Sequence, residues 1–118
     1  MRFLGLLYGP EGAGPAVATP DFGQMLVDYQ AAMGAMAKAG VLVDRGPLQP
    51  VSAAATVRVR DWGTEVIAGP FPEIWIHAGA FLILDCADME EAIRWVAGTP
   101  AASVGSVEVR PLMTQVPG

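Results

Sequence analysis

The side chains best suited to chemistry are concentrated in one short segment, AGPFPEIWIHAG, at residues 68–79. It contains the only histidine of the chain, His77, together with Trp75 and Glu73. Histidine titrates near neutral pH and is the commonest general acid or base. If the segment is extended, Trp75 and His77 lie on one side of it, because strand side chains alternate with period two. The pattern predicts a pocket wall with one ring for stacking and one for proton transfer. The alternative is a histidine hydrogen-bonded at a strand start or at a dimer seam.

Two carboxylates are candidates to orient His77. Glu73 stands in an otherwise apolar stretch, where burial would raise its pKa and suit it to acid–base work. A solvated carboxylate, or an ion pair with an arginine, is the plainer interpretation. Asp85 follows an apolar run and is the second candidate, although it also suits the turn into the next helix. Cys86, beside it, needs a nearby base to act as a nucleophile.

Several other side chains favour binding of an apolar ligand. Methionines fill irregular cores and also line adaptable pockets, and Met33 recurs with Tyr29 on one face of a predicted helix. Arg58 shares a strand face with Arg60 and is suited to bind a carboxylate or enolate oxygen. The alternative for this pair is cross-strand pairing with Glu65, Asp61 or Glu108. The side chains expected to bind substrate are Trp75, Tyr29, Tyr8, Met33, Arg58 and Phe71.

The charge and the cysteine count exclude several classes of protein. The chain has 118 residues, a net charge of −5, and seven Lys and Arg residues that are scattered along it. Binding to nucleic acid or to an anionic membrane surface requires a basic patch and is disfavoured. One cysteine and one histidine are too few for a structural zinc site. No phosphate-binding loop, dinucleotide fingerprint or metal cluster is visible, so we expect no cofactor and no metal.

No apolar run approaches the roughly 20 residues of a membrane span. The apolar N-terminal run breaks at Gly9 and Pro10, and its period fits a strand better than a signal sequence. We therefore expect a cytoplasmic protein with one domain over residues 1–118.

The elements that must position these residues are marked by their periodicity and by capping residues. One helix is predicted from Pro20, capped by Thr19 and ended by Gly40. A second is capped by Asp88, with Glu91 completing a capping box, and is stopped by Gly98 and Pro100. Its expected inner stripe is Met89, Ala92, Ile93 and Val96. Strands are predicted at 3–8, 41–43, 54–60, 64–67, 81–84 and 106–112, with 54–67 forming a hairpin and Val107 and Val109 facing inward.

This order predicts an α+β fold, a ferredoxin-like antiparallel sheet with two helices on one face. Apolar residues make up 53% of the chain and charged residues only 16%. The strands at 3–8 and 81–84 are apolar on both faces, yet two helices cover only one face of a sheet. The other face must therefore contact a surface that excludes water, and a second copy of the sheet related by two-fold symmetry is the simplest candidate. We therefore expect a homodimer.

At this point the sequence resembles the YCII-related proteins of the DGPF subgroup. The segments that carry the resemblance are FLGLLYG at 3–9, AGVLVDRGPLQP at 39–50, TVRVRD at 56–61, AGPF at 68–71, LILD at 82–85, EEAIRWVAGTPAA at 90–102 and GSVEVRPLM at 105–113. The resemblance implies a dimeric α/β-barrel arrangement of ferredoxin-like units. It also implies small-molecule chemistry such as dehydrochlorination, with a His-Asp pair proposed for the wider family. The signature Asp-Gly-Pro-Phe reads Ala68-Gly69-Pro70-Phe71 here, so its carboxylate is missing.

The residues and the resemblance together predict a small cofactor-independent enzyme. It would catalyse an isomerisation, cyclisation or elimination on an apolar, aromatic or polyketide-like molecule. His77 would move the proton and Glu73 or Asp85 would orient it. The alternative is a non-catalytic dimeric module that binds a ligand or another protein, with Ile74, Trp75 and Ile76 at the seam.

Overall fold

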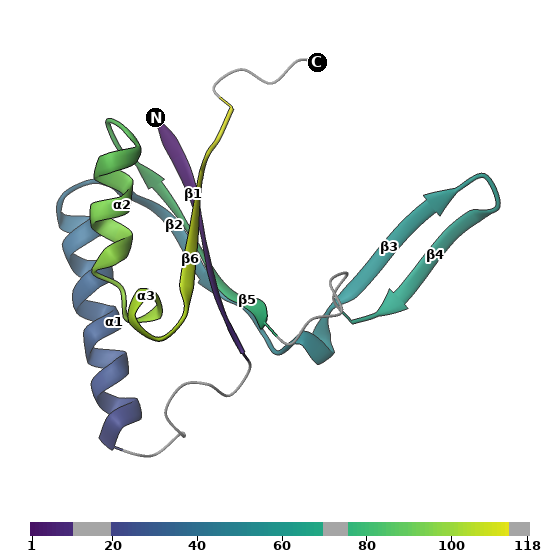
Figure 1. Cartoon of the computed structure of the whole chain (residues 1–118), viewed down its shortest axis with the longest axis horizontal. Helices are drawn as coiled ribbons and strands as arrows, with labels where there is room; N and C mark the ends of the chain where they lie inside the picture. The colour runs from purple at the N-terminus through teal and green to yellow at the C-terminus, as the bar shows by residue number, and fades with distance from the viewer. Residues whose placement is uncertain (11–19, 70–75, 114–118) are drawn as a thin grey trace.

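The computed structural model describes residues 1–10, 20–69 and 76–113. A four-stranded antiparallel sheet has the order β2-β5-β1-β6, and three helices lie on one of its faces (Figure 1). Its strands are β1 (Arg2–Pro10), β2 (Leu42–Pro47), β5 (Ile76–Asp85) and β6 (Ser106–Pro111). The helices are α1 (Pro20–Lys38), α2 (Met89–Ala97) and α3 (Pro100–Val104). The expected ferredoxin-like α+β fold is confirmed.

The predicted hairpin forms, but it does not join the main sheet. Strands β3 (Ala55–Arg60) and β4 (Gly63–Ala68) make a separate two-stranded sheet that projects away from the body (Figure 1). A short 3-10 turn, η1 (Val51–Ala53), precedes it. Gly63 is the first residue of β4 and has a φ of +125°, a backbone conformation that glycine adopts readily because it has no Cβ atom. The ferredoxin-like unit thus carries an inserted hairpin between β2 and β5.

The helix signals in the sequence act largely as predicted. Gly40 ends the first helix with φ +76°, and the next amide, that of Val41, donates to the Met36 carbonyl over 3.0 Å. The Asp88 side chain accepts a 2.9 Å hydrogen bond from the Glu91 amide at the start of α2. Thr19, the expected cap of the first helix, lies outside the described residues.

The predicted end of the second helix is confirmed, and one residue of its predicted inner stripe is wrong. The helix α2 ends at Ala97, just before Gly98, and Pro100 also begins the short helix α3, a position where its fixed φ is favourable. Ile93 was expected in the inner stripe but is half exposed, whereas Trp95 packs against the core. The other members of the predicted stripe are confirmed, because Ala92 and Val96 are buried and Met89 packs against the core.

The core lies between the helices and one face of the sheet. Strand side chains from β1 and β5 meet two buried methionines of α1 and two buried residues of α2. The buried set is Phe3, Leu7, Met33, Met36, Val41, Leu82, Leu84, Cys86, Ala92 and Val96.

The second face of the sheet, which we call the open face, is also apolar. Leu4 stands opposite Ile83 and Leu6 opposite Phe81, and all four are half-buried. In Figure 1 the helices lie on the other side of the sheet. A Cβ atom at Gly46 of β2 would lie 2.6 Å from a Phe81 ring carbon, so this ring lies over the glycine. The prediction that these strands are apolar on both faces is confirmed.

Candidate functional site

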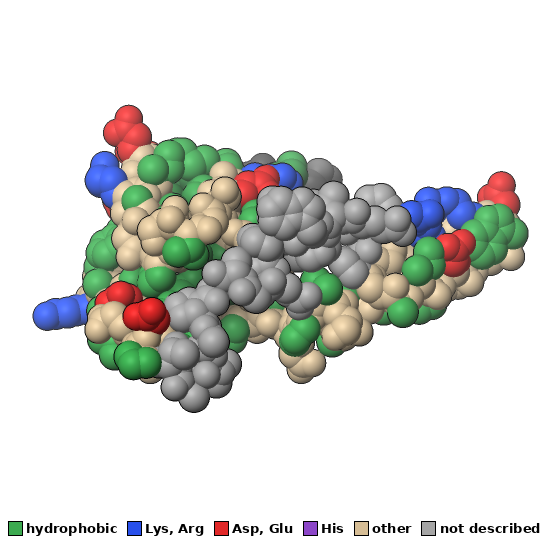
Figure 2. Space-filling view, turned by 60° about the horizontal axis from the view of Figure 1, so that its bottom comes forward, with side chains coloured by type: hydrophobic (Ala, Val, Ile, Leu, Met, Phe, Trp, Pro, Cys, Tyr) green, Lys and Arg blue, Asp and Glu red, His purple; other side chains and the backbone are tan. Residues whose placement is uncertain are grey.

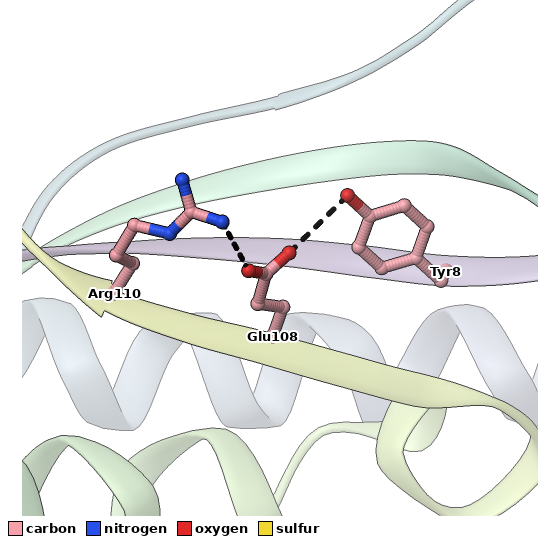
Figure 3. Close-up of polar contacts among 3 residues, drawn as sticks. All are labelled: Tyr8, Glu108 and Arg110. Carbon is pink, nitrogen blue, oxygen red and sulfur yellow. Dashed lines mark hydrogen bonds and ion pairs between the residues drawn. The ribbon is translucent and has the colours of Figure 1, made fainter. Parts of the chain in front are cut away.

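Three polar side chains form a connected group on β1 and β6 (Figure 3). The Tyr8 hydroxyl donates to Oε1 of Glu108 over 3.3 Å. An Nη2 hydrogen of Arg110 bonds the other carboxylate oxygen, Oε2, over 2.6 Å. The carboxylate is therefore held between a phenol and a guanidinium, one partner on each oxygen.

The strand alternation places this group on the open face. Val107 and Val109 of β6 pack against the core, so Glu108 and Arg110 point to the opposite side, as predicted. Residues directly opposite in an antiparallel pair share a face, and Glu108 stands opposite Leu6. The polar group therefore borders the half-buried apolar patch of the open face.

The electrostatics of Tyr8 determine what its hydroxyl does. Its pKa is raised above 10.0, first by burial and then by the negative charge and the hydrogen bond of Glu108, while Arg110 acts in the opposite direction. The phenol is therefore neutral at physiological pH and acts as a proton donor. The Tyr8 hydroxyl, a neutral donor, and the Glu108 carboxylate, an acceptor, therefore lie next to each other beside the apolar side chains of the open face.

Two of the predicted catalytic residues, His77 and Asp85, lie at opposite ends of β5. The backbone of His77 lies in β5 opposite Gly9, next to the Tyr8–Ala78 pair. Asp85 lies at the other end of the same strand, where it is exposed and bonds the amino group of Met1 over 3.1 Å. Eight residues of extended strand separate the two by about 26 Å. One chain therefore does not bring Asp85 to His77.

The other predicted residues that the structure describes, apart from Tyr8, lie in two places. Tyr29 and Met33 lie on α1, on the helix side of the sheet, where Met33 is buried and Tyr29 half-buried against the core. Burial raises the pKa of Tyr29, and a backbone hydrogen bond with Ala101 opposes this. The structure therefore separates Tyr29 and Met33 from Tyr8 by the thickness of the sheet. Arg58 stands on the projecting hairpin opposite Glu65, the cross-strand arrangement considered as its alternative.

The residues Phe71, Glu73 and Trp75 lie outside the described residues. The other potential nucleophile, Cys86, is buried. Burial, followed by the nearby Glu91 carboxylate, raises the pKa of its thiol to about 11. The thiol is therefore protonated near neutral pH and unsuited to nucleophilic attack.

A shallow depression of about 510 Å³ lies on the helix side of the molecule, lined by Ala39, Val41, Glu91, Arg94 and Trp95. Among the described side chains, Asp85 does not line it. Among residues 1–10, 20–69 and 76–113, no three His, Cys, Asp or Glu side chains are grouped to hold a metal ion. In the same ranges, no helix has the length and apolar character needed to cross a bilayer.

Glu108 and Arg110 were predicted to face outward, and Glu108 was also considered as a partner of Arg58 and Arg60; its actual contacts with Tyr8 and Arg110 were missed. The available signal was the alternation SVEVRP, which places two opposite charges on one strand face. Their contact with Tyr8 also requires β1 and β6 to be neighbours, which follows from the ferredoxin-like strand order and from no local pattern.

Fold and site together define a ferredoxin-like α+β domain with a polar group on the uncovered face of its sheet. The YCII-related domain family matches residues 24–115, and the chain belongs to this family. An uncharacterised protein of Rhizobium meliloti (strain 1021) is 33% identical over 120 residues, covering 100% of this chain and 97% of that protein.

A solved structure shares the fold. It is 5-chloro-2-hydroxyhydroquinone dehydrochlorinase from Burkholderia phenoliruptrix AC1100 in complex with 2,5-dihydroxybenzoquinone. The TM-score is 0.51 at 15% sequence identity, and the match covers 96% of this chain and 94% of that chain. At this identity the likeness supports the fold assignment.

Proposed function

We propose that this protein is a small cofactor-independent enzyme that moves protons on an apolar aromatic or polyketide-like molecule. The observation that carries the proposal is the Glu108 carboxylate, held between the Tyr8 hydroxyl and the Arg110 guanidinium beside the apolar patch of the open face. A positioned acid and base suffice for isomerisation, cyclisation or elimination. The dehydrochlorinase that shares the fold supports elimination among these.

The chemistry divides between the two side chains. The Glu108 carboxylate takes a proton from an acidic C–H or O–H bond of the substrate. The electron pair of that bond then forms a new double bond. In an elimination the neighbouring bond to the departing group breaks and its own electron pair leaves with that group, such as chloride; in an isomerisation the π pair of a neighbouring carbonyl moves onto its oxygen. The Tyr8 hydroxyl donates a hydrogen bond to the oxygen that gains negative charge, which is a large source of stabilisation in such reactions. Glu108 afterwards returns the proton to product or solvent.

We include His77 in the proposed site as a second group able to move protons. Its backbone position in β5 is adjacent to the residue that faces Tyr8, so both belong to the same end of the sheet. Glu73, Trp75 and Phe71 remain proposed partners of His77, since they precede it directly in the chain.

We further propose a homodimer formed through the open face. Leu4, Leu6, Phe81 and Ile83 make an apolar stripe that the helices do not cover. Contiguous apolar patches of this kind mark interaction sites or binding grooves. A second copy facing the stripe would exclude water from the Tyr8–Glu108 pair and strengthen its electrostatic effect on a substrate.

The test uses the single histidine as a reporter. The His77 ring signals are followed by NMR while 2,5-dihydroxybenzoquinone is added, and chloride release from 5-chloro-2-hydroxyhydroquinone is measured without oxygen. We expect saturable shifts of the His77 signals, and binding at least tenfold weaker in Glu108→Gln. If His77 is unaffected by the quinone and by a wider panel of aromatic acids and polyketide-like ketones, the proposed enzyme site is wrong.

The alternative function is a non-catalytic dimeric module that binds a ligand or another protein. The projecting β3–β4 hairpin, with its exposed apolar side chains, favours it. Ligand binding at the open face without turnover of any tested compound, unchanged by Tyr8→Phe, would support this module over the enzyme.

A further inference from the structure

The β3–β4 hairpin, residues 55–68, which we call the arm, has one apolar face. Val57 stands opposite Val66, and Val59 follows on the same side. These three valines are 59%, 67% and 68% exposed in the order Val57, Val66, Val59. Trp62, in the turn at the tip, is 64% exposed. The arm thus presents a row of bulky apolar side chains to water.

The other face of the arm is polar. Arg58 stands opposite Glu65, and both are half-buried, while the neighbouring pair is Thr56 and Ile67. Figure 2 shows arginine and acidic side chains alongside hydrophobic ones on this projecting part of the molecule. This contrast between the two faces is typical of strands that bury their apolar face against another surface and leave their polar face in contact with solvent.

The arm stands away from the core of its own chain. Its root is closed by the Gly69 amide, which donates to the Ala54 carbonyl over 2.7 Å, and by the Thr56 hydroxyl, which donates to the Gly69 carbonyl over 2.8 Å. From that root it extends beyond the main sheet (Figure 1). A lone two-stranded hairpin is marginally stable in water. The described part of the chain therefore leaves the valine face uncovered.

We propose that the valine face of the arm packs against a second copy of this chain, so that each protomer of the dimer is held by the arm of its partner. This inference rests on the proposed homodimer and adds the element that makes it stable. The interface is reciprocal, because two-fold symmetry places both arms in equivalent contacts.

The area of the interface supports a second copy of this chain as the partner of the arm. The four strands have 9, 6, 10 and 6 residues. At about 3.3 Å per residue and about 4.8 Å between strands, the open face measures roughly 500 Å² as a flat area. Two such faces bury about 1,000 Å², which is only the lower limit for a biological interface. Each arm adds a face of about 200 Å² and covers as much of its partner. Two arms raise the total to about 1,800 Å², within the standard size range for a stable complex.

The test removes the apolar face and keeps the hairpin. Val57→Lys with Val66→Glu places opposite charges directly across the ladder, which preserves strand pairing while making the valine face polar. The matched control, Arg58→Glu with Glu65→Arg, exchanges the existing opposite charges on the other face of the same arm. Sedimentation velocity over a range of concentrations gives the dimer dissociation constant. Circular dichroism checks that each variant is folded.

We expect the wild type and the charge-exchanged control to sediment at twice the chain mass of 12.3 kDa. The Val57→Lys, Val66→Glu variant should dissociate at concentrations at least 100-fold higher. Should this variant dimerise as tightly as the wild type, the arm does not dock on a second copy. If it unfolds, Val57→Thr with Val66→Thr replaces it, because threonine retains the shape and strand preference of valine.

A separate variant distinguishes failure of the arm from failure of the proposed dimer. Leu6→Glu introduces a charge into the apolar stripe of the open face and leaves the arm intact. Weaker dimerisation in Leu6→Glu alone would overturn the arm contact and retain the sheet interface. A monomeric wild type would overturn both. A direct readout is photo-cross-linking with a benzophenone attached to the cysteine of Val59→Cys, in a Cys86→Ala background. We expect cross-links between two chains. Cross-links within one chain only would contradict the proposal.

Discussion

The hydroxyl of Tyr8 donates a hydrogen bond to Oε1 of Glu108 although the two residues are 100 positions apart in the chain. The contact joins the central strand β1 to the edge strand β6, on the side of the sheet away from the helices. The contact places a hydrogen-bonded phenol and carboxylate on the open face, which an interface made only of apolar contacts would not require. Arg110 completes the group by holding the second carboxylate oxygen.

Replacing Tyr8 with phenylalanine tests the role of this hydroxyl. The ring and its packing remain, so the free energy of unfolding should change by less than about 1 kcal/mol. Turnover of an accepted substrate should fall about 100-fold, the lower end of the effect of a positioned acid or base. Steady-state kinetics and urea unfolding of the same preparation measure both quantities.

The comparison variant is Tyr29→Phe, which removes a hydroxyl on the helix side of the sheet. Because the sheet separates this residue from Glu108, turnover should be unchanged. Equal losses in the two variants would contradict a site on the open face.

The stability of the protein should fall at alkaline pH through Cys86. Burial and the Glu91 carboxylate raise its pKa from 9.0 to about 11. The folded protein keeps the thiol proton where the unfolded chain releases it, so this contribution is fully present below pH 9 and is lost as the pH rises to 11. The loss amounts to about 2 kcal/mol.

Urea unfolding at pH 8 and at pH 11, for the wild type and Cys86→Ala, measures this effect. The raised pKa values of Tyr8 and Tyr29 act in the same direction in both proteins and cancel in the comparison. The wild type should lose more stability between the two pH values than Cys86→Ala does. Parallel pH profiles would show that the thiol environment is not as described.

Three glycine-to-alanine variants should differ in the sign of their effect. A Cβ at Gly105 would meet the Tyr8 backbone carbonyl, which cannot move away, so we expect a loss of about 3 kcal/mol. At Gly46 the Cβ would meet the Phe81 ring, a side chain that can rotate, and the loss should be about 1 kcal/mol. Gly34, in α1 with open space around it, should gain up to about 1 kcal/mol. Urea unfolding would refute this ranking if Gly105→Ala were as stable as the wild type.

The start of α2 depends on the side chain of Asp88. Asp88→Ala removes the acceptor of the Glu91 amide and should cost about 1 kcal/mol. Asp88→Asn, which caps nearly as well, should restore most of it. Thermal unfolding of the two variants provides the measurement, and equal midpoints would show that the hydrogen bond contributes nothing.

The sequence predicted those features that depend on neighbours along the chain. The glycine end of α1, the Asp88 cap and the outward direction of Glu108 and Arg110 all follow from local geometry, since capping and alternation involve residues within a few positions. The Ile93 expectation failed because Ile93 is rotated by about 100° from Ala92, which places it beyond the edge of the face that Met89, Ala92 and Val96 turn to the core. The start of α3 at Pro100 was missed because proline both ends and begins helices.

By itself, the sequence determined the strands, the long helices and which strand residues share a face, because these follow from periods of 2 and 3.6 residues. Only the tertiary structure decided which residues meet across strands. It placed Tyr8 beside Glu108, set Asp85 at the opposite end of β5 from His77, and kept the β3–β4 hairpin out of the main sheet. The physical reason is that backbone hydrogen bonds between strands are nearly independent of side-chain identity. Strand order is therefore set by the packing of the whole core rather than by any local segment.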